Sequence, residues 1–269
     1  YHLLENKSIA RTGIIHVGAL TYTVTQQAPP PPPVVLSSVA NAANYTTDAV
    51  SPGEIVTLFG SNLGPASIVT LQLNDKGAVT TNLAETQVLF DGVAAPMIYT
   101  AAGQVSAVVP YGVAGKSSTK VQVQYQGAVS NTQTVTVHAA TPGIFTLDAS
   151  GSGPGAILNQ DNTVNTSSNP AARSSIIAIY LTGGGVTTPA SVDGSVAPAP
   201  PPQLTQTPVV TVGGVNAVVK FAGASPGSVT GLTQINVEVP AGAAPSLALP
   251  VVIKIGDFSS TGVATVAVN

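Results

Sequence analysis

The sequence predicts an all-β protein that consists of two tandem immunoglobulin-like β-sandwiches with an N-terminal β-hairpin arm. Short runs of Val, Ile, Thr and Tyr, bounded by Gly, Pro, Asn and Asp, recur along the whole chain, as is typical of strands and turns. Helical periodicity is hard to find anywhere. In addition, one set of strand-like segments occurs twice in the same order, which indicates a duplicated unit.

The arm is expected over residues 1–28, and its centre, Arg11 to Gln26, has the pattern of a hairpin. Apolar and threonine residues alternate in its second half, and Gly18-Ala19 supplies a two-residue turn with glycine where a positive φ is needed. An isolated hairpin is at best marginally stable in water. Its open edges and apolar side chains should therefore pair with or pack against another sheet. The residues expected to make this assembly contact are Ile15, Val17, Leu20, Tyr22 and Val24.

The arm is joined to the rest of the chain by residues 29–33, which are all proline and predict a semi-rigid polyproline linker. Donation of the arm to another copy is one interpretation. The arm could instead fold back on the first sandwich, or be the stub of an upstream domain. The sequence opens at Tyr1 without a basic and apolar leader, so we expect a processed or partial chain.

The first sandwich is expected over residues 34–139 and the second over 140–269. Two copies of a unit of roughly 100 residues with short strands fit a pair of immunoglobulin-like sandwiches. Asp91-Gly92 and Gly213-Gly214 occupy the same place in the two copies and predict tight hairpin turns. The matched segments are Gly53 to Phe59 with Ser174 to Tyr180, Val88 to Val93 with Val210 to Val215, and Gln104 to Pro110 with Gln234 to Pro240.

The composition excludes several classes of function. Only 7% of the residues are charged, whereas a soluble domain usually carries about 25%, and no basic cluster accompanies the net charge of −3. We therefore expect neither nucleic acid nor an anionic membrane as a partner. The absence of cysteine rules out disulfides and thiolate metal sites, and no apolar run reaches the ~20 residues of a membrane helix.

The search for chemistry predicts no catalytic residue, no cofactor site and no metal site. Gly223-Ala224-Ser225-Pro226-Gly227 matches the Gly-x-Ser-x-Gly pattern of serine hydrolases. However, the residue after the nucleophile must donate a backbone N–H to the oxyanion, and proline has none. The segment is better explained as a Pro-Gly turn. Gly183 to Gly185 lacks the following helix of a phosphate-binding loop, so it is read as an ordinary loop.

The remaining polar candidates have structural explanations. A cation could bind the side-chain oxygens of Asn159, Asp161, Asn162 and Asn165. Calcium, however, binds about six to eight oxygens including carboxylates, and Asp161 is the only carboxylate in this segment. An Asx-stabilised turn is the simpler interpretation. His2, His16 and His138 lie in or beside strand patterns, without the spacing that holds a metal. The acidic residues are scattered, and only their chance meeting in space leaves room for an enzyme.

Several separated motifs resemble a known family. NAANY (41–45), SPGEIVTLFGSNLGP (51–65), TPGIF (141–145), LNQD (158–161) and NPAAR (169–173) are similar to the Solibacter-type C-terminal domain of secreted acidobacterial proteins. RTGIIHV (11–17) and YTVTQ (22–26) resemble the last strands of a BACON domain, an extracellular module often linked to carbohydrate or mucin binding. The resemblance implies an extracellular paired β-sandwich without an assigned activity.

Sequons predict candidate glycosylation at Asn6, Asn44 and Asn165. Taken together, the sequence predicts a secreted, non-enzymatic structural subunit of an extracellular fibre. Copies of the chain would be its partners, with bound or covalent glycans as further partners. In such a fibre the arm adds strands to the next copy head to tail, a contact that gives an open filament. The alternative is a secreted adhesion or carbohydrate-binding module.

Overall fold

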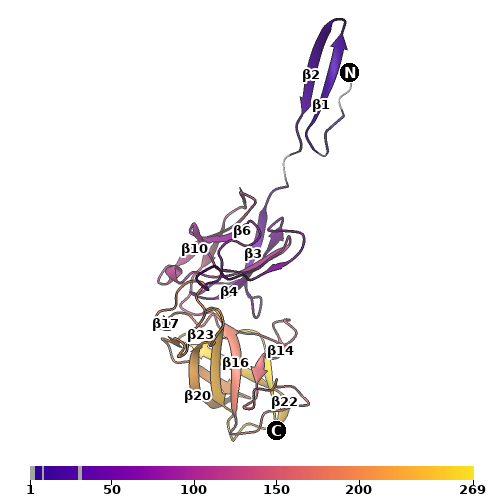
Figure 1. Cartoon of the computed structure of the whole chain (residues 1–269). Helices are drawn as coiled ribbons and strands as arrows, with labels where there is room; N and C mark the ends of the chain where they lie inside the picture. The colour runs from indigo at the N-terminus through magenta and orange to yellow at the C-terminus, as the bar shows by residue number, and fades with distance from the viewer. Residues whose placement is uncertain (1–3, 8, 30–31) are drawn as a thin grey trace. The chain divides into compact units, whose positions relative to one another are not determined.

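The computed structural model describes residues 4–7, 9–29 and 32–269. The chain divides into two units, Tyr1–Pro33 and Val34–Asn269 (Figure 1). The described residues form strands, turns and a single 3-10 turn at Tyr111–Val113, so the predicted all-β class is confirmed. None of them forms a helix that is long and apolar enough to span a membrane. Predictions that involve Tyr1, His2, Ser8 and residues 30–31 lie outside the described residues.

The N-terminal unit contains the predicted hairpin. β1 (Arg11–Val17) pairs antiparallel with β2 (Leu20–Gln26), and the pairing runs without a register shift from Arg11↔Gln26 to Val17↔Leu20. Gly18 has a φ of 60°, whereas Ala19 keeps a negative φ, which is the pattern of a type II′ turn. This turn matches the twist of the two strands, and therefore a connection of two residues suffices.

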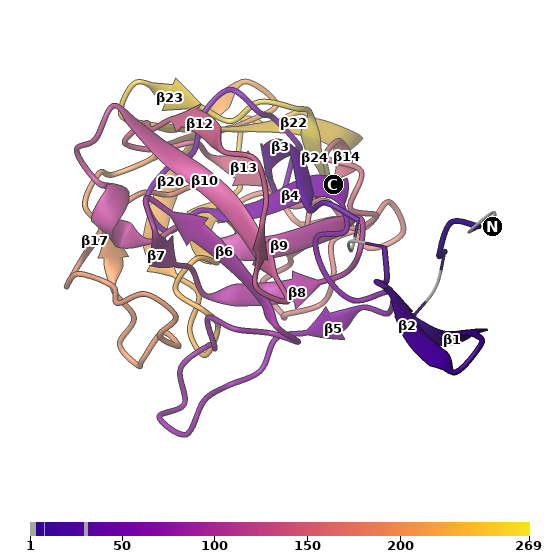
Figure 2. The same ribbon diagram turned by 90° about the horizontal axis from the view of Figure 1, so that it is seen from above.

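Residues 34–137 form a first β-sandwich from two sheets (Figure 2). One sheet has the order β3-β4-β9-β8-β5, and the other has the order β11-β10-β6-β7 with β12 also on β10. Alternate residues of β6 and β10 are buried, as expected for strands with one face on a core. The strands are β3 (Val35–Asn41), β4 (Ile55–Ser61), β5 (Val69–Thr70), β6 (Thr86–Phe90), β7 (Val93–Ala94), β8 (Met97–Thr100), β9 (Gln104–Val108), β10 (Ser118–Tyr125), β11 (Ala128–Val129) and β12 (Gln133–Thr136).

Residues 140–268 form the second core, which is separate from the first. The long strand β20 pairs with β19 through its first part and with β21 through the rest, so it connects the two layers. Its register shifts between Val219 and Phe221, which bends the strand. The strands are β13 (Gly143–Ile144), β14 (Gly153–Pro154), β15 (Ile157–Leu158), β16 (Ile176–Thr182), β17 (Thr187–Thr188), β18 (Gln203–Leu204), β19 (Val209–Val212), β20 (Val215–Ala224), β21 (Thr233–Glu238), β22 (Ser246–Ile255), β23 (Phe258–Ser259) and β24 (Ala264–Val268).

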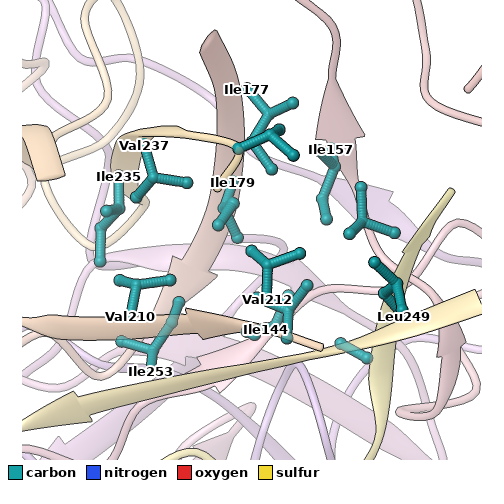
Figure 3. Close-up of a cluster of buried hydrophobic side chains, with 14 of the residues drawn as sticks. Ile144, Ile157, Ile177, Ile179, Val210, Val212, Ile235, Val237, Leu249 and Ile253 are labelled. Carbon is teal, nitrogen blue, oxygen red and sulfur yellow. The ribbon is translucent and has the colours of Figure 1, made fainter. Parts of the chain in front are cut away.

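Branched aliphatic side chains fill the second core (Figure 3). Ile177 and Ile179 of β16, Ile235 of β21 and Ile253 of β22 are fully buried. Burying such a side chain contributes about 1.5–3 kcal/mol. A core of β-branched residues on paired strands explains how this domain folds without a cysteine or a tryptophan.

The internal repeat is visible in the strands. Each matched segment forms a strand in both copies: β4 corresponds to β16, β6 to β19 and β9 to β21. Both predicted turns are present. Asp91 and Gly92 have φ of 50° and 82°, and Gly213 and Gly214 have φ of 59° and 79°. Two positive φ values define a type I′ hairpin turn, for which Asp-Gly and Gly-Gly are preferred sequences.

Candidate functional site

The hairpin has one apolar face. Ile15 is opposite Tyr22, and Val17 is opposite Leu20, while Val24 follows on the same side of the ribbon. The five predicted assembly residues therefore lie together. Within this hairpin Val17, Leu20 and Tyr22 are 57%, 60% and 54% exposed, and Ile15 and Val24 are half-buried. This is a contiguous apolar surface on a two-stranded sheet.

The other face of the hairpin is mostly polar. The threonines of both strands point to this side, where Thr12 is opposite Thr25 and His16 is opposite Thr21. The His16 Nδ1 and Thr21 Oγ1 atoms are 3.2 Å apart, within hydrogen-bond distance. Ile14, which is 62% exposed, is the one apolar side chain on this face. The hairpin is therefore amphipathic, and the face of the five assembly residues gains more from being covered.

The described residues before β1 contact the end of the hairpin that lies away from the turn. Gln26 Nε2 donates to Leu4 O at 2.8 Å, and Asn6 Nδ2 donates to Gln27 O at 2.8 Å. Arg11 Nε donates to Gln26 Oε1 at 2.9 Å. These bonds hold the base of the hairpin and leave its apolar face accessible.

A second feature lies where the two sandwiches meet. Glu54, at the start of β4, is completely buried. Its Oε2 accepts hydrogen bonds from the Ser51 backbone N–H at 2.7 Å and from Thr141 Oγ1 at 2.6 Å. Thr141 belongs to the segment that leads into the second sandwich, and Asn41 Nδ2 donates to its carbonyl at 2.9 Å. A carboxyl group of the first sandwich is thus bonded directly to the second.

Burial dominates the protonation of this carboxyl group. Because the charged form loses its hydration, the pKa of Glu54 rises to about 8, although the hydrogen bonds from Thr141 and from the Ser51 backbone oppose the rise. Oε1 is buried without a hydrogen bond in the described structure. Glu54 is therefore mostly protonated at neutral pH.

Other contacts across the same junction hold the two sandwiches together. Tyr111 Oη donates to Thr230 O at 2.9 Å, and the Tyr111 N–H donates to Asp193 Oδ1 at 2.8 Å. The His138 ring stacks on Phe258 with ring centroids 4.6 Å apart. These contacts explain why residues 34–269 form one compact unit although they contain two cores.

The side-chain amides of the three sequon asparagines all donate hydrogen bonds within the chain. Asn165 is only 4% exposed, and its Nδ2 donates to Asn159 Oδ1 and Ala267 O, both at 2.9 Å. Asn44 Nδ2 donates to Thr261 Oγ1 at 3.0 Å, and Asn6 Nδ2 donates to Ile9 O at 2.7 Å. A glycan on any of these nitrogens would have to replace such a bond, at the highest cost for Asn165. Glycosylation stays a prediction.

The Asn-rich segment that the sequence singled out lines an open cleft of about 480 Å³. Much of the polar lining is already engaged: Asn159 Nδ2 donates to Asn169 O, and Asn169 Nδ2 donates to Val164 O, both at 3.0 Å. Asp161 Oδ1 accepts from the Thr163 N–H at 3.0 Å, as the predicted Asx turn requires. No group of three or more His, Asp or Glu residues in the described chain is placed to hold a metal ion.

The hydrolase-like motif is a turn. Ser225 is buried directly after β20, and Pro226 and Gly227 form the turn that follows. The sequence missed the role of Glu54, which had only been seen as part of a strand. One signal was present: the repeat places Ser175 at the equivalent position, so a carboxylate in the first copy stands where the second has a hydroxyl.

Part of the chain matches a family model, and solved structures show a remote similarity to it. Residues 44–137 match the model of the IPT/TIG domain family, which is immunoglobulin-like. The alignment with a crystal structure of the I9–I11 tandem from titin covers 97% of this chain and 74% of the titin chain. The sequence identity is 10% and the TM-score is 0.26. The alignment with an endo-fucoidan hydrolase of glycoside hydrolase family 107 covers 98% of this chain and 34% of the hydrolase chain. The sequence identity is 12% and the TM-score is 0.22. No curated protein sequence matches the chain.

Proposed function

We propose that this chain is a non-catalytic structural subunit of an extracellular fibre, in which the N-terminal hairpin joins one copy to another. The matched immunoglobulin-like family is consistent with a structural or adhesion-type module. The extracellular location rests on the resemblance to the Solibacter-type and BACON domains, which remains a prediction.

The observation that carries the proposal is the uncovered apolar face of the hairpin. Val17, Leu20 and Tyr22 are each more than half exposed on a sheet of only two strands. Two strands alone are marginally stable in water, and at least a third strand or a packed face is needed for independent stability. A second copy of the chain can supply either.

The compact unit of residues 34–269 suits the body of such a fibre. Hydrogen bonds of Glu54 and Tyr111 at the junction connect its two sandwiches. In the head-to-tail arrangement that the sequence predicts, a sandwich of the next copy accepts the hairpin. Such a heterologous contact builds an open filament unless its rotation closes a ring.

The test compares the molecular mass of the full chain with that of a double variant, Leu20→Thr and Tyr22→Thr, by light scattering over a range of concentrations. The variant keeps strand-forming residues but replaces two of the five apolar side chains of the face, including two of its three most exposed ones. The matched control, Thr21→Ser and Thr23→Ser, changes the opposite face. We expect the wild type and the control to associate and the apolar-face variant to stay monomeric. Equal masses for all three would refute the proposal, and electron microscopy would show whether the associated form is a fibre.

An adhesion or carbohydrate-binding module is the second candidate. The open cleft beside Asn159 and Asn169 has an uncharged, amide-rich lining apart from Asp161, and such groups can bond sugar hydroxyls. Because those amides already bond within the chain, the cleft is the weaker of the two arguments. Glycan-array binding that survives deletion of residues 1–28 and is lost in Asn169→Ala would favour this candidate.

A further inference from the structure

We infer that the hairpin's partner is the same hairpin of a second copy, paired antiparallel with it through the outer edges of the two β2 strands. This inference rests on the part of the proposed function that makes the hairpin the contact between copies, and it specifies a different acceptor for that hairpin. It differs from the head-to-tail arrangement because no sandwich accepts a strand.

Residues 34–269, which are all described, have few long open strand edges. Most of the sheet paths in this unit end on strands of two residues, as natural proteins protect their edges. The longer edge strands β3 and β12 are partly occupied. Asn131 Oδ1 accepts from the Leu36 N–H, Asn131 Nδ2 donates to Leu36 O, both at 2.9 Å, and Val50 N–H donates to Thr136 O at 2.9 Å.

The two edges of the hairpin differ in how well they can pair with another strand. β1 contains Arg11, Gly13 and His16, and a charge or a glycine on an edge strand weakens pairing. β2, with the sequence LTYTVTQ, has no charge, glycine or proline. Its residues are those that favour strands, and such a segment of seven residues is a ready template for another strand.

The hydrogen-bond pattern of the hairpin determines the register in which two β2 strands can pair. Since Val17 and Leu20 flank a two-residue turn, they form a hydrogen-bonded pair. The pattern alternates along an antiparallel ribbon, so the backbone groups of Thr21, Thr23 and Thr25 point away from β1. A two-fold axis at Thr23 places Thr23 opposite Thr23 of the second copy, and Thr21 opposite its Thr25. All these outward groups are then paired.

The same register also suits the side chains. Tyr22 of one copy lies opposite Val24 of the other, and an aromatic residue beside a β-branched one is a favourable cross-strand pair. The apolar faces of the two hairpins become one continuous face on a four-stranded sheet. This two-fold contact alone joins two copies, and the enlarged apolar face is where a fibre makes its further contact.

The experiment uses cysteine cross-linking of the full chain, which has no cysteine of its own. In the inferred pair the two Thr23 Cα atoms are about 5.5 Å apart, within the ~4.4–6.8 Å that a disulfide spans. The two Thr21 Cα atoms are about 14 Å apart because Thr25, which lies opposite Thr21 of the other copy, is four positions along the strand. Thr23→Cys should therefore double the mass under oxidising, non-reducing conditions, and Thr21→Cys should not.

A mixed sample provides the register test. Thr21→Cys and Thr25→Cys chains of distinguishable mass, oxidised together, should give the mixed disulfide in preference to either homodimer. The inference is overturned if Thr23→Cys cross-links no better than Thr21→Cys while the wild type still associates through the apolar face, because the acceptor then lies elsewhere. If the wild type is monomeric at all concentrations, the proposed function itself fails.

Discussion

Thr141 donates its hydroxyl hydrogen to Glu54 Oε2 at 2.6 Å, and this bond connects the first sandwich to the segment that begins the second. Ser51 Oγ lies 2.7 Å from the same hydroxyl. The carboxyl group is thus the centre of a small buried polar network at the junction. Buried networks of this kind are costly to leave half satisfied, so the junction should respond sharply to changes in either residue.

Stability should depend on pH through Glu54. The pKa of this group is about 8 in the folded chain against 4.5 ordinarily, so the folded state binds its proton more tightly than the unfolded state does. The contribution to stability is therefore complete below about pH 4.5, falls as the pH rises toward 8, and is absent above that. The limiting slope is about 1.4 kcal/mol per pH unit.

Urea unfolding at a series of pH values, carried out on the wild type and on Glu54→Gln, measures this contribution. Glutamine has the same shape but does not titrate. The unfolding free energy of the wild type minus that of Glu54→Gln should fall as the pH rises from 5 to 8, because only the wild type loses stability. A difference that stays constant over this range would show that Glu54 has an ordinary pKa.

Replacing Thr141 by valine should destabilise the chain by about 1–3 kcal/mol, because a buried acceptor loses its donor while the volume is kept. Thr134→Val, on an exposed position of β12, should change stability by less than about 0.5 kcal/mol. In a double-mutant cycle, Thr141→Val and Glu54→Gln should be non-additive, since the residues are in contact. Additive effects would mean that Thr141 bonds the amide of glutamine as well as it bonds the carboxyl group.

Gly183 is a test of how closely the junction is packed. Its φ is +75°, and a Cβ there would lie 2.0 Å from Thr141 O, whereas Gly214 has a φ of +79° with nothing within 4 Å. Gly214→Ala should cost about 1–2 kcal/mol from the left-handed conformation alone. Gly183→Ala should cost clearly more, because the backbone of residue 141 must move. Thermal unfolding that ranks the two variants equally would contradict the close approach.

Charge on the hairpin edge should control association. Thr23→Lys places two like charges directly opposite each other in the inferred pair, and like charges there are destabilising. Thr23→Glu does the same with the other sign. Each variant alone should be monomeric by light scattering, whereas an equal mixture should associate again. Failure of the mixture to associate, with both single variants monomeric, would indicate that position 23 tolerates no charge for another reason.

Local features of the fold were predictable from the sequence. The Gly18-Ala19, Asp91-Gly92 and Gly213-Gly214 turns require positive φ at specific positions, and glycine, or aspartate at Asp91, marks those positions. Alternation of apolar and polar residues gave the apolar face of the hairpin, since the side-chain period of a strand is two. The repeat indicated which strands of the two sandwiches correspond.

The junction was not predictable in the same way. Glu54 and Thr141 are 87 residues apart in the sequence, and nothing local to either residue signals their contact. Asn165 shows the same limit. Its sequon suggests an exposed attachment site, yet its amide is buried and bonds Ala267 through both Nδ2 and Oδ1.

The sequence by itself determined the strands, the turns, the duplication and the amphipathic hairpin, because each depends on φ preferences or on the period of two within a few residues. Only the tertiary structure decided the environment of Glu54, the use of the sequon amides and which sheet edges remain open. Burial and hydrogen bonding between distant segments depend on how the sheets pack, and it is packing that raises the pKa of Glu54. It also closes most strand edges of the sandwiches and leaves β2 as the most suitable edge for a second copy.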